Sequence, residues 1–195
     1  MLRTQLAAIA AAARATGAHP WVMAPMVATA AEAREFARQC RDANLSTVGV
    51  MVEIPAAALS ARAILSEVDF ISIGTNDLSQ YTFAADRMCG ELADLIDPWQ
   101  PALLSLVAAC GEAGRALGKP VGVCGEAAAD PALAPVLVGL GVTSLSMAAR
   151  SVAAVRESLA AVTLDECRRR ATAALAGAGP SEARLVAQRT QAPTG

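Results

Sequence analysis

The residues most suited to chemistry lie in the segment Gly74–Tyr81, which follows the apolar run Val68–Ile73. The run is rich in β-branched residues and too short for a helix, which predicts a buried strand. Gly74 lets the backbone turn at the carboxyl end of that strand, and Asn76 and Asp77 follow directly. Because ligands of α/β proteins bind at the carboxyl ends of parallel strands, this amide and carboxylate predict a functional site.

Two further segments follow the same pattern. The apolar run 48–52 leads into Glu53, and the run 120–123 leads into Cys124. Three predicted strands therefore present polar groups at one end. Carboxylates on neighbouring strands, here Glu53 and Asp77, are the oxygen ligands that Mg²⁺ prefers, with water or substrate oxygens in the remaining positions. The pattern predicts a magnesium site at this edge of the sheet.

The same residues belong to longer motifs, which are Val50–Pro55, Ile71–Thr82, Ala84–Arg87 and Gly122–Glu126. With these motifs, the chain resembles the C-terminal, phosphoenolpyruvate-binding domain of Enzyme I of the bacterial sugar phosphotransferase system, a relative of pyruvate phosphate dikinase. The resemblance extends from Leu2–Gln5 to Leu145–Met147 and fades after about residue 160.

The resemblance implies a role for each polar residue at the site. Glu53 and Asp77 would hold Mg²⁺, and Asn76 with Arg87 would bind the phosphate and carboxylate of phosphoenolpyruvate. Arg3 aligns with an arginine that lies near the phosphate. Phosphoryl transfer depends mainly on cations placed around an anionic substrate, and the planar fork of Arg87 can bind oxyanions through two hydrogen bonds.

Cys124 is implied to be the acid that protonates the enolate left after phosphoryl transfer, which gives pyruvate. A thiol with a free pKa near ~8.5 can donate that proton and recover it close to neutral pH. Without the resemblance, a small buried apolar residue would be the favoured interpretation of Cys124. Glu126 could orient the thiol or coordinate through water.

Structural explanations compete with each functional one. Asn76 and Asp77 could cap the helix that follows them, and Glu53 could be a carboxylate placed against a helix dipole. Arg87 could pair with a neighbouring surface carboxylate, a contact that contributes little. Each explanation is competitive alone, but the occurrence of all these residues at successive strand ends favours a shared site.

The elements that must position these residues alternate between strand and helix, which predicts parallel βαβ units. The resemblance makes them strands four to eight of a (β/α)8 TIM barrel that is truncated at its N-terminus, since a complete barrel takes ~250 residues and the chain has 195. The predicted strands are 21–27, 48–53, 68–73, 120–124 and 144–147. The predicted helices between them are 30–40, 56–65, 101–117 and 131–140.

Residues 1–176 are expected to form this partial barrel, and 177–195 a short helix over 182–189 followed by a disordered end. The connector 97–101 contains two prolines, and Trp99 either lies at an interface or packs against its own helix. A half barrel would expose a strand edge and an apolar face that a partner must cover. A homodimer is expected from the resemblance.

Composition narrows the classes of function and partner. Hydrophobic residues make up 54% of the chain, aromatic residues 3%, and the net charge is -2, without a basic cluster suited to nucleic acid. The apolar segment 7–13 is too short for a membrane span and is predicted to be helical, so no membrane association and a cytoplasmic location are expected. An odd number of cysteines without paired spacing argues against disulfides and zinc. Four of the five should be small buried residues, namely Cys40, Cys89, Cys110 and Cys167.

The predicted function is the phosphoenolpyruvate- and Mg²⁺-binding part of a phosphotransferase that starts the phosphoryl relay for sugar uptake. The phosphoryl group would pass to a histidine-bearing phosphocarrier domain or protein, because the only histidine, His19, falls in a predicted loop. One alternative is a fragment of a pyruvate phosphate dikinase-like enzyme. Another is a catalytically silent module that dimerises or senses a metabolite.

Overall fold

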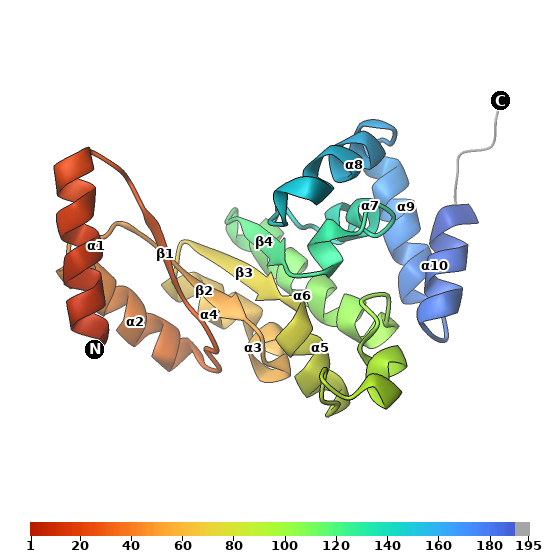
Figure 1. The fold of residues 1–195 in the computed structure, drawn as a ribbon, viewed down its shortest axis with the longest axis horizontal. Helices are drawn as coiled ribbons and strands as arrows, with labels where there is room; N and C mark the ends of the chain where they lie inside the picture. The colour runs from red at the N-terminus through yellow and green to blue at the C-terminus, as the bar shows by residue number, and fades with distance from the viewer. Residues whose placement is uncertain (190–195) are drawn as a thin grey trace.

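The computed structural model describes residues 1–189. Its centre is one five-stranded sheet in which every neighbouring pair is parallel and the strands follow chain order (Figure 1). This arrangement confirms the parallel α/β architecture expected from alternating strands and helices. The strands are β1 (Trp21–Ala24), β2 (Thr47–Val52), β3 (Phe70–Gly74), β4 (Val121–Cys124) and β5 (Ser144–Leu145).

Helices precede, connect and follow the strands. The helices before β4 are α1 (Leu2–Thr16), α2 (Ala30–Asp42), α3 (Pro55–Leu59), α4 (Ala61–Glu67), α5 (Thr75–Phe83), the 3₁₀ helix η1 (Gly90–Ile96) and α6 (Pro101–Leu117). Those after β4 are the 3₁₀ helix η2 (Ala127–Ala129), α7 (Ala134–Gly139), α8 (Ala149–Ala160), α9 (Leu164–Leu175) and α10 (Pro180–Arg189).

Helix α2 shows how the local sequence sets an element that packs on the sheet. Thr29 caps its N-terminus by accepting a hydrogen bond from the backbone of Glu32, and the Glu32 carboxylate accepts one from the backbone of Thr29. Phe36, Ala37 and Cys40 lie on one side of the helix and are buried. The cap fixes where α2 begins, and the apolar stripe fixes which side meets the sheet.

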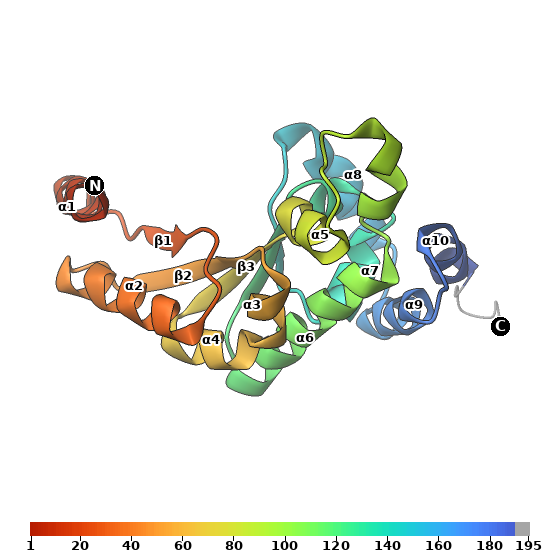
Figure 2. The same cartoon turned by 90° about the horizontal axis from the view of Figure 1, so that it is seen from below.

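The two faces of the sheet differ in how they are covered. Figure 2 shows α2, α3, α4 and α6 along one face. The strand residues that face these helices are at most 1% exposed, and they are Val48, Val50, Val52, Ile71, Ile73, Val121 and Val123. On the opposite face the ring of Trp21 meets Phe70, with 4.9 Å between ring centroids, across Gly49 of the intervening strand. Trp21 is nevertheless 62% exposed.

Several predicted boundaries need correction. The first strand was predicted over 21–27 but ends at Ala24, because Pro25 follows and Met26 takes a positive φ of 56°. The last strand is two residues rather than the predicted four. Helix α6 begins and ends as predicted, at Pro101 and Leu117.

The helix predicted over 56–65 is in fact two helices, α3 and α4, which meet at Ser60. The helix predicted over 131–140 is shorter, since α7 begins only at Ala134. Helix α8 was not among the predicted helices.

The C-terminal part contains a helix near the predicted position, because α10 spans Pro180–Arg189 and packs on α9. The predicted disorder of the chain end falls on residues 190–195, outside the described residues, and the division into two units at residue 176 stays a prediction. Among residues 1–189, we find no helix with the length and apolarity needed to cross a bilayer.

Candidate functional site

The register of the sheet brings the predicted site residues to one edge. Gly74, the last residue of β3, pairs with Cys124, the last residue of β4. Val52 of β2 pairs with Ile73, so Glu53 follows at the level of Gly74. Three neighbouring strands therefore end at one level, with a carboxylate, a helix start and a thiol side by side.

Glu53 is a buried carboxylate at the end of β2, and its side chain is held in place. The residue is 6% exposed, and its Oε2 accepts a hydrogen bond from the backbone N–H of Met26 at 2.9 Å. The competing interpretation, in which the Glu53 carboxylate interacts with the dipole of helix α3, does not account for this hydrogen bond. Ile54 is the N-cap of α3, and the first turn of that helix contains no acidic residue.

Gly74 is required by the closeness of Glu53. A Cβ atom at position 74 would lie 2.7 Å from Cγ and 2.8 Å from Oε1 of Glu53. These distances are shorter than those of real Cβ contacts. Glycine therefore leaves room for the carboxylate beside the start of α5. The glycine that suggested a turn in the sequence has a second role, which is to admit this side chain.

Asn76 and Asp77 lie in the first turn of α5, whose N-cap is Gly74. No side chain caps this helix, so the capping explanation for the two residues is not supported. The Asn76 Oδ1 atom accepts a hydrogen bond from the backbone N–H of Glu126 at 3.4 Å, which joins α5 to the segment after β4. Asp77 Oδ1 lies 4.0 Å from a terminal nitrogen of Arg87. The pairing of Arg87 thus involves a predicted site residue.

The turn after β4 is fitted against the start of α5. Gly125 has a φ of +89°, and a Cβ there would lie 2.9 Å from Thr75 Oγ1 and 3.0 Å from Asn76 Oδ1. The Thr75 hydroxyl donates a hydrogen bond to the Cys124 carbonyl at 3.0 Å, and Thr75 is 2% exposed. These contacts fix the backbone around Cys124.

The Cys124 side chain is half-buried, and its Sγ lies 3.5 Å from the carbonyl oxygen of Ile73. Burial raises the pKa of the thiol above its ordinary value, and the charges of Glu53 and Asp77 raise this pKa further, while a hydrogen bond with Ser72 acts in the opposite direction. The thiol is therefore protonated at neutral pH. This is the state that a proton donor requires.

A pocket of about 310 Å³ lies beside these strand ends and is lined by both polar and apolar side chains. Its lining combines an amide, a guanidinium and a carboxylate with two apolar residues, namely Asn76, Arg87, Glu126, Met88 and Ile96. Asn76 and Arg87, both predicted to bind the substrate, therefore share one pocket.

The residues present fit a magnesium ion better than a transition metal. The donor set is two carboxylates, Glu53 and Asp77, and Mg²⁺ is usually held by one or two carboxylates together with waters and substrate oxygens. Within residues 1–189, no group of three or more His, Cys, Asp and Glu side chains is gathered as a metal site. The carboxylates alone do not complete a coordination shell, so any ion here would depend on water and substrate.

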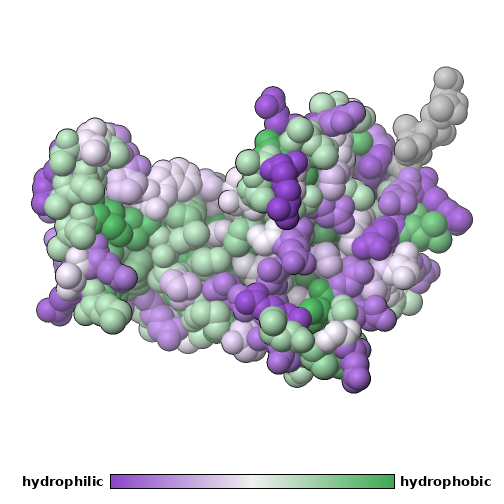
Figure 3. Space-filling view, viewed as in Figure 1, coloured by the Kyte–Doolittle hydropathy of each residue, from purple (hydrophilic) through white to green (hydrophobic). Residues whose placement is uncertain are grey.

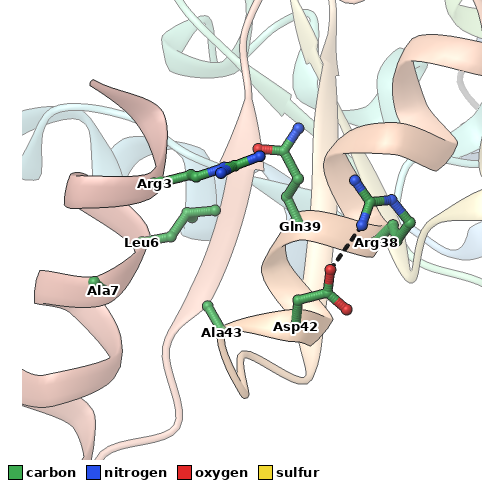
Figure 4. Close-up of a pocket in the computed structure, with 7 residues that line it drawn as sticks. All are labelled: Arg3, Leu6, Ala7, Arg38, Gln39, Asp42 and Ala43. Atoms are coloured by element: carbon green, nitrogen blue, oxygen red, sulfur yellow. Dashed lines mark hydrogen bonds and ion pairs between the residues drawn. The ribbon is translucent and has the colours of Figure 1, made fainter.

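Arg3 is the predicted site residue that lies apart from these strand ends, in a different pocket. Its side chain extends from α1 toward Gln39 of α2 (Figure 4). Arg38 and Asp42 lie nearby, with 2.8 Å between a terminal nitrogen of Arg38 and Oδ2 of Asp42. A separate apolar hollow of about 620 Å³ lies between α1 and the edge strand β1, and Phe36 of α2 also lines it. A role for Arg3 in substrate binding stays a prediction.

The remaining cysteines mostly follow the expectation. Cys40, Cys110 and Cys167 are buried, and burial raises the pKa of Cys110 to about 12. Cys89 was also predicted to be buried, but it is partly exposed because it lies in the loop before η1. Among the described cysteines, Cys124 alone stands at the end of a strand.

Sequence reasoning did not identify three residues that shape the site. They are Thr75 and Gly125, which fit the α5 start against the turn after β4, and Gln80, whose Oε1 accepts a hydrogen bond from the backbone N–H of Arg87 at 3.2 Å. Thr75 and Gln80 lie inside a recognised motif, but their partners are 49 and 7 residues away. Pattern alone does not reveal these contacts.

Comparison with known proteins identifies the family of the chain. Residues 1–164 match the family described as PEP-utilising enzyme, PEP-binding domain. A phosphoenolpyruvate-protein phosphotransferase of Streptomyces coelicolor is 60% identical over 189 residues, covering 96% of this chain and 34% of that protein. Proteins of the same name from Latilactobacillus sakei and Bacillus subtilis are 46% and 40% identical, over 69% and 85% of this chain and 26% and 31% of their own lengths.

The chain thus spans about a third of the length of the curated relatives it matches. The family match nevertheless includes every site residue described above, from Glu53 to Glu126. The chain belongs to the family of PEP-utilising enzymes, as a PEP-binding domain.

Proposed function

We propose that the chain is the phosphoenolpyruvate- and Mg²⁺-binding part of a phosphoenolpyruvate-protein phosphotransferase. The observation that carries the proposal is the convergence of Glu53, Asp77 and Cys124 at the ends of adjacent parallel strands, beside a pocket lined by Asn76 and Arg87. Functional sites of α/β proteins occur at this edge. The names of the relatives give the substrate class.

Glu53 and Asp77 are the proposed ligands of Mg²⁺. When bound, the ion would neutralise charge on the phosphoryl oxygens of the substrate. Glu53 is suited to this role because its other contact, with the N–H of Met26, fixes the orientation of the carboxylate. Asp77 is suited because its Oδ1 lies 4.0 Å from Arg87, which lines the pocket. An ion held by Asp77 and the guanidinium of Arg87 could therefore contact the same bound anion.

Asn76 and Arg87 are the proposed substrate-binding residues. Both line the 310 Å³ pocket, which has room for a three-carbon phosphorylated acid. Arg87 can donate two parallel hydrogen bonds to a carboxylate or phosphate, and the Asn76 amide can donate one. The carboxylate of Glu126 in the same pocket opposes free anions, so cations should be needed for tight binding.

Cys124 is the proposed proton donor. Breaking the ester P–O bond would transfer the phosphoryl group to a histidine of another domain or protein and leave enolpyruvate. The thiol proton would then move to the terminal carbon of enolpyruvate to give pyruvate, and the resulting thiolate would recover a proton from water. The raised pKa of the thiol supports this role, because it keeps the proton in place until the enolate forms.

The sheet is proposed to be strands four to eight of a (β/α)8 barrel. The uncovered face of the sheet and the unpaired edge of β1 support this interpretation, since both need a covering partner. Figure 3 shows the hydrophobic hollow between α1 and the rest of the molecule. Its lining includes Leu2, Ile9 and Val22. The proposal also includes a phosphocarrier histidine on another domain or protein, a role in sugar uptake and a homodimer.

A second candidate is a module that binds the metabolite without turnover. The placement of Arg3 favours it, because Arg3 lies on the side of α1 that faces α2 and contributes no charge to the pocket. The two candidates differ in proton transfer. An active Cys124 would exchange the methyl protons of pyruvate for deuterium in D₂O with Mg²⁺, and Cys124→Ala would abolish the exchange. A silent module would show no exchange.

Calorimetric titration of phosphoenolpyruvate with and without Mg²⁺ tests the site itself. We expect Mg²⁺-dependent binding by the chain and at least a tenfold loss of affinity in Asp77→Ala. Asp42→Ala is a matched control, because Asp42 is an exposed carboxylate that pairs with Arg38 on α2. Failure of the folded wild-type chain to bind, or equal binding by Asp77→Ala and Asp42→Ala, would refute the proposed site.

A further inference from the structure

Residues 84–100, between α5 and α6, form one wall of the candidate pocket. This segment, called here the pocket segment, contains Arg87, Met88 and Ile96, three of the five residues that line the pocket. Its only regular element is the 3₁₀ helix η1, none of whose residues is buried. A segment with so few buried contacts depends on its two ends for a fixed position.

The first end of the pocket segment is held by α5. Ala84 takes a positive φ of 49°, and the backbone N–H of Ala85 donates to the Gln80 carbonyl at 3.0 Å. The Gln80 side chain accepts a hydrogen bond from the backbone N–H of Arg87, and Asp86 Oδ1 accepts one from the N–H of Met88 at 2.8 Å. These contacts belong to the motif that also supplies Asn76 and Asp77.

The other end of the pocket segment is held by Trp99. This side chain is fully buried, which settles the question of whether it packs within its own chain. Its indole N–H donates to Asp130 Oδ2 at 2.9 Å, and its backbone N–H donates to Asp97 Oδ1 at 2.9 Å. Trp99 therefore joins the pocket segment to the loop that precedes α7.

Arg184 of α10 lies over this same anchor. Its guanidinium carbon is 5.4 Å from the centroid of the Trp99 ring, within the range of a cation–π interaction. One of its terminal nitrogens lies 3.5 Å from Asp97 Oδ2, so Asp97 contacts both Trp99 and Arg184. Helix α10 is itself seated by Ala183 and Ala187, which are at most 1% exposed. A helix that packs through these two alanines thus presents a cation to the end of the pocket segment.

We propose that Arg184 is a positioning residue that fixes the pocket segment and, through it, the placement of Arg87. Arg184 lies beyond residues 1–164, the part of the chain that matches the PEP-binding domain family. The identity of the anion that Arg87 binds rests on the proposed function, but the positioning role does not. The C-terminal helix is therefore part of the site's architecture, although it is remote from the strand ends in sequence.

Amide hydrogen exchange followed by mass spectrometry on the full chain tests this proposal without any ligand. Arg184→Ala should raise exchange at amides 86–97 by about 5- to 30-fold, because a cation–π contact and an ion pair are lost. Exchange in β2 and β3 should not change. Arg184→Lys should restore part of the protection, because it keeps a cation over the ring.

Arg168→Ala is the matched control, since Arg168 forms an exposed ion pair with Asp165 on the neighbouring helix α9. Equal exchange at 86–97 in Arg184→Ala and Arg168→Ala would overturn the proposal. A uniform rise that includes β2 and β3 would also overturn it, because the effect would then be global. Failure of the wild-type chain to bind phosphoenolpyruvate would refute the proposed function. It would not affect the positioning role of Arg184, which the exchange experiment tests without a ligand.

Discussion

The Glu53 carboxylate and the Met26 backbone N–H are joined by a hydrogen bond of 2.9 Å that links the ends of two neighbouring strands. Met26 has a φ of 56°, so the chain turns sharply after β1 and directs this N–H toward the end of β2. Oε2 takes part in this bond, while Oε1 lies beside Gly74 at the start of α5. One oxygen of Glu53 therefore makes a structural contact and the other faces the start of α5, so substitutions can separate the hydrogen bond from the charge.

We expect Glu53→Gln to retain the fold and to lose Mg²⁺-dependent binding of phosphoenolpyruvate by at least tenfold. The amide oxygen can still accept the Met26 hydrogen bond, but the charge that attracts the cation is gone. Glu53→Ala should also lower the free energy of unfolding by about 1–3 kcal/mol, because it leaves that N–H without its partner. Urea denaturation and calorimetry measure the two effects. Wild-type affinity in Glu53→Gln would contradict the proposed magnesium ligand.

Gly125 and Gly118 allow backbone strain to be separated from crowding at the site. Both have positive φ, +89° and +63°, but a Cβ at Gly118 meets no atom within 4 Å, whereas one at Gly125 would crowd Thr75 and Asn76. Gly118→Ala should cost about 1–2 kcal/mol of unfolding free energy, from the left-handed backbone alone. Gly125→Ala should cost more and should also weaken phosphoenolpyruvate binding. Equal costs and unchanged binding would show that the Gly125 contacts do not support the site.

The strand ends could be predicted from the sequence because they depend on short-range patterns. A β-branched run, a glycine and then a carboxylate or amide appear within about ten residues, and alternating strands and helices imply a parallel sheet. The convergence of Glu53, Asp77 and Cys124 follows once the strands pair in chain order. The actual pairing, with Gly74 opposite Cys124, supplies that order.

The remaining features depend on contacts between distant segments. Trp99 and Arg184 are 85 positions apart in number, and nothing in the pattern around either residue indicates that they meet. Arg3 is the opposite case, since a motif suggests a place near the phosphate, whereas the structure places Arg3 beside α2. Motifs identify the groups that can do chemistry, whereas tertiary contacts determine which of them share a pocket.

The Cys124 thiol should react with iodoacetamide only at alkaline pH. Burial and the nearby carboxylates raise its pKa, so the reactive thiolate should form with a midpoint above the ordinary ~8.5. Glu53→Gln should lower the midpoint, because one of the two charges is removed. Peptide mapping by mass spectrometry separates Cys124 from the other cysteines. A midpoint at or below ~8.5 would contradict a thiol that holds its proton.

The same raised pKa makes the stability of the fold depend on pH. The folded state binds the Cys124 proton more tightly than the unfolded state, so this contribution is complete below the unfolded pKa. It is lost as the pH rises through the raised folded value. Cys124→Ala should therefore flatten the fall in unfolding free energy above about pH 8.5. Parallel falls in wild type and variant would show that other groups cause the loss.

The face of the sheet opposite α2, α3, α4 and α6 offers a final test at Gly49. The rings of Trp21 and Phe70 approach each other across this residue, and a Cβ there would overlap the Phe70 ring. Gly49→Ala should lower the free energy of unfolding by about 1–3 kcal/mol through overpacking, whereas Gly90→Ala, where no atom lies within 4 Å, should change it little. Phe70→Leu combined with Gly49→Ala should recover part of the loss, since the smaller side chain relieves the overlap. Strictly additive effects of the two substitutions would contradict the view that position 49 must be glycine to make room for the Phe70 ring.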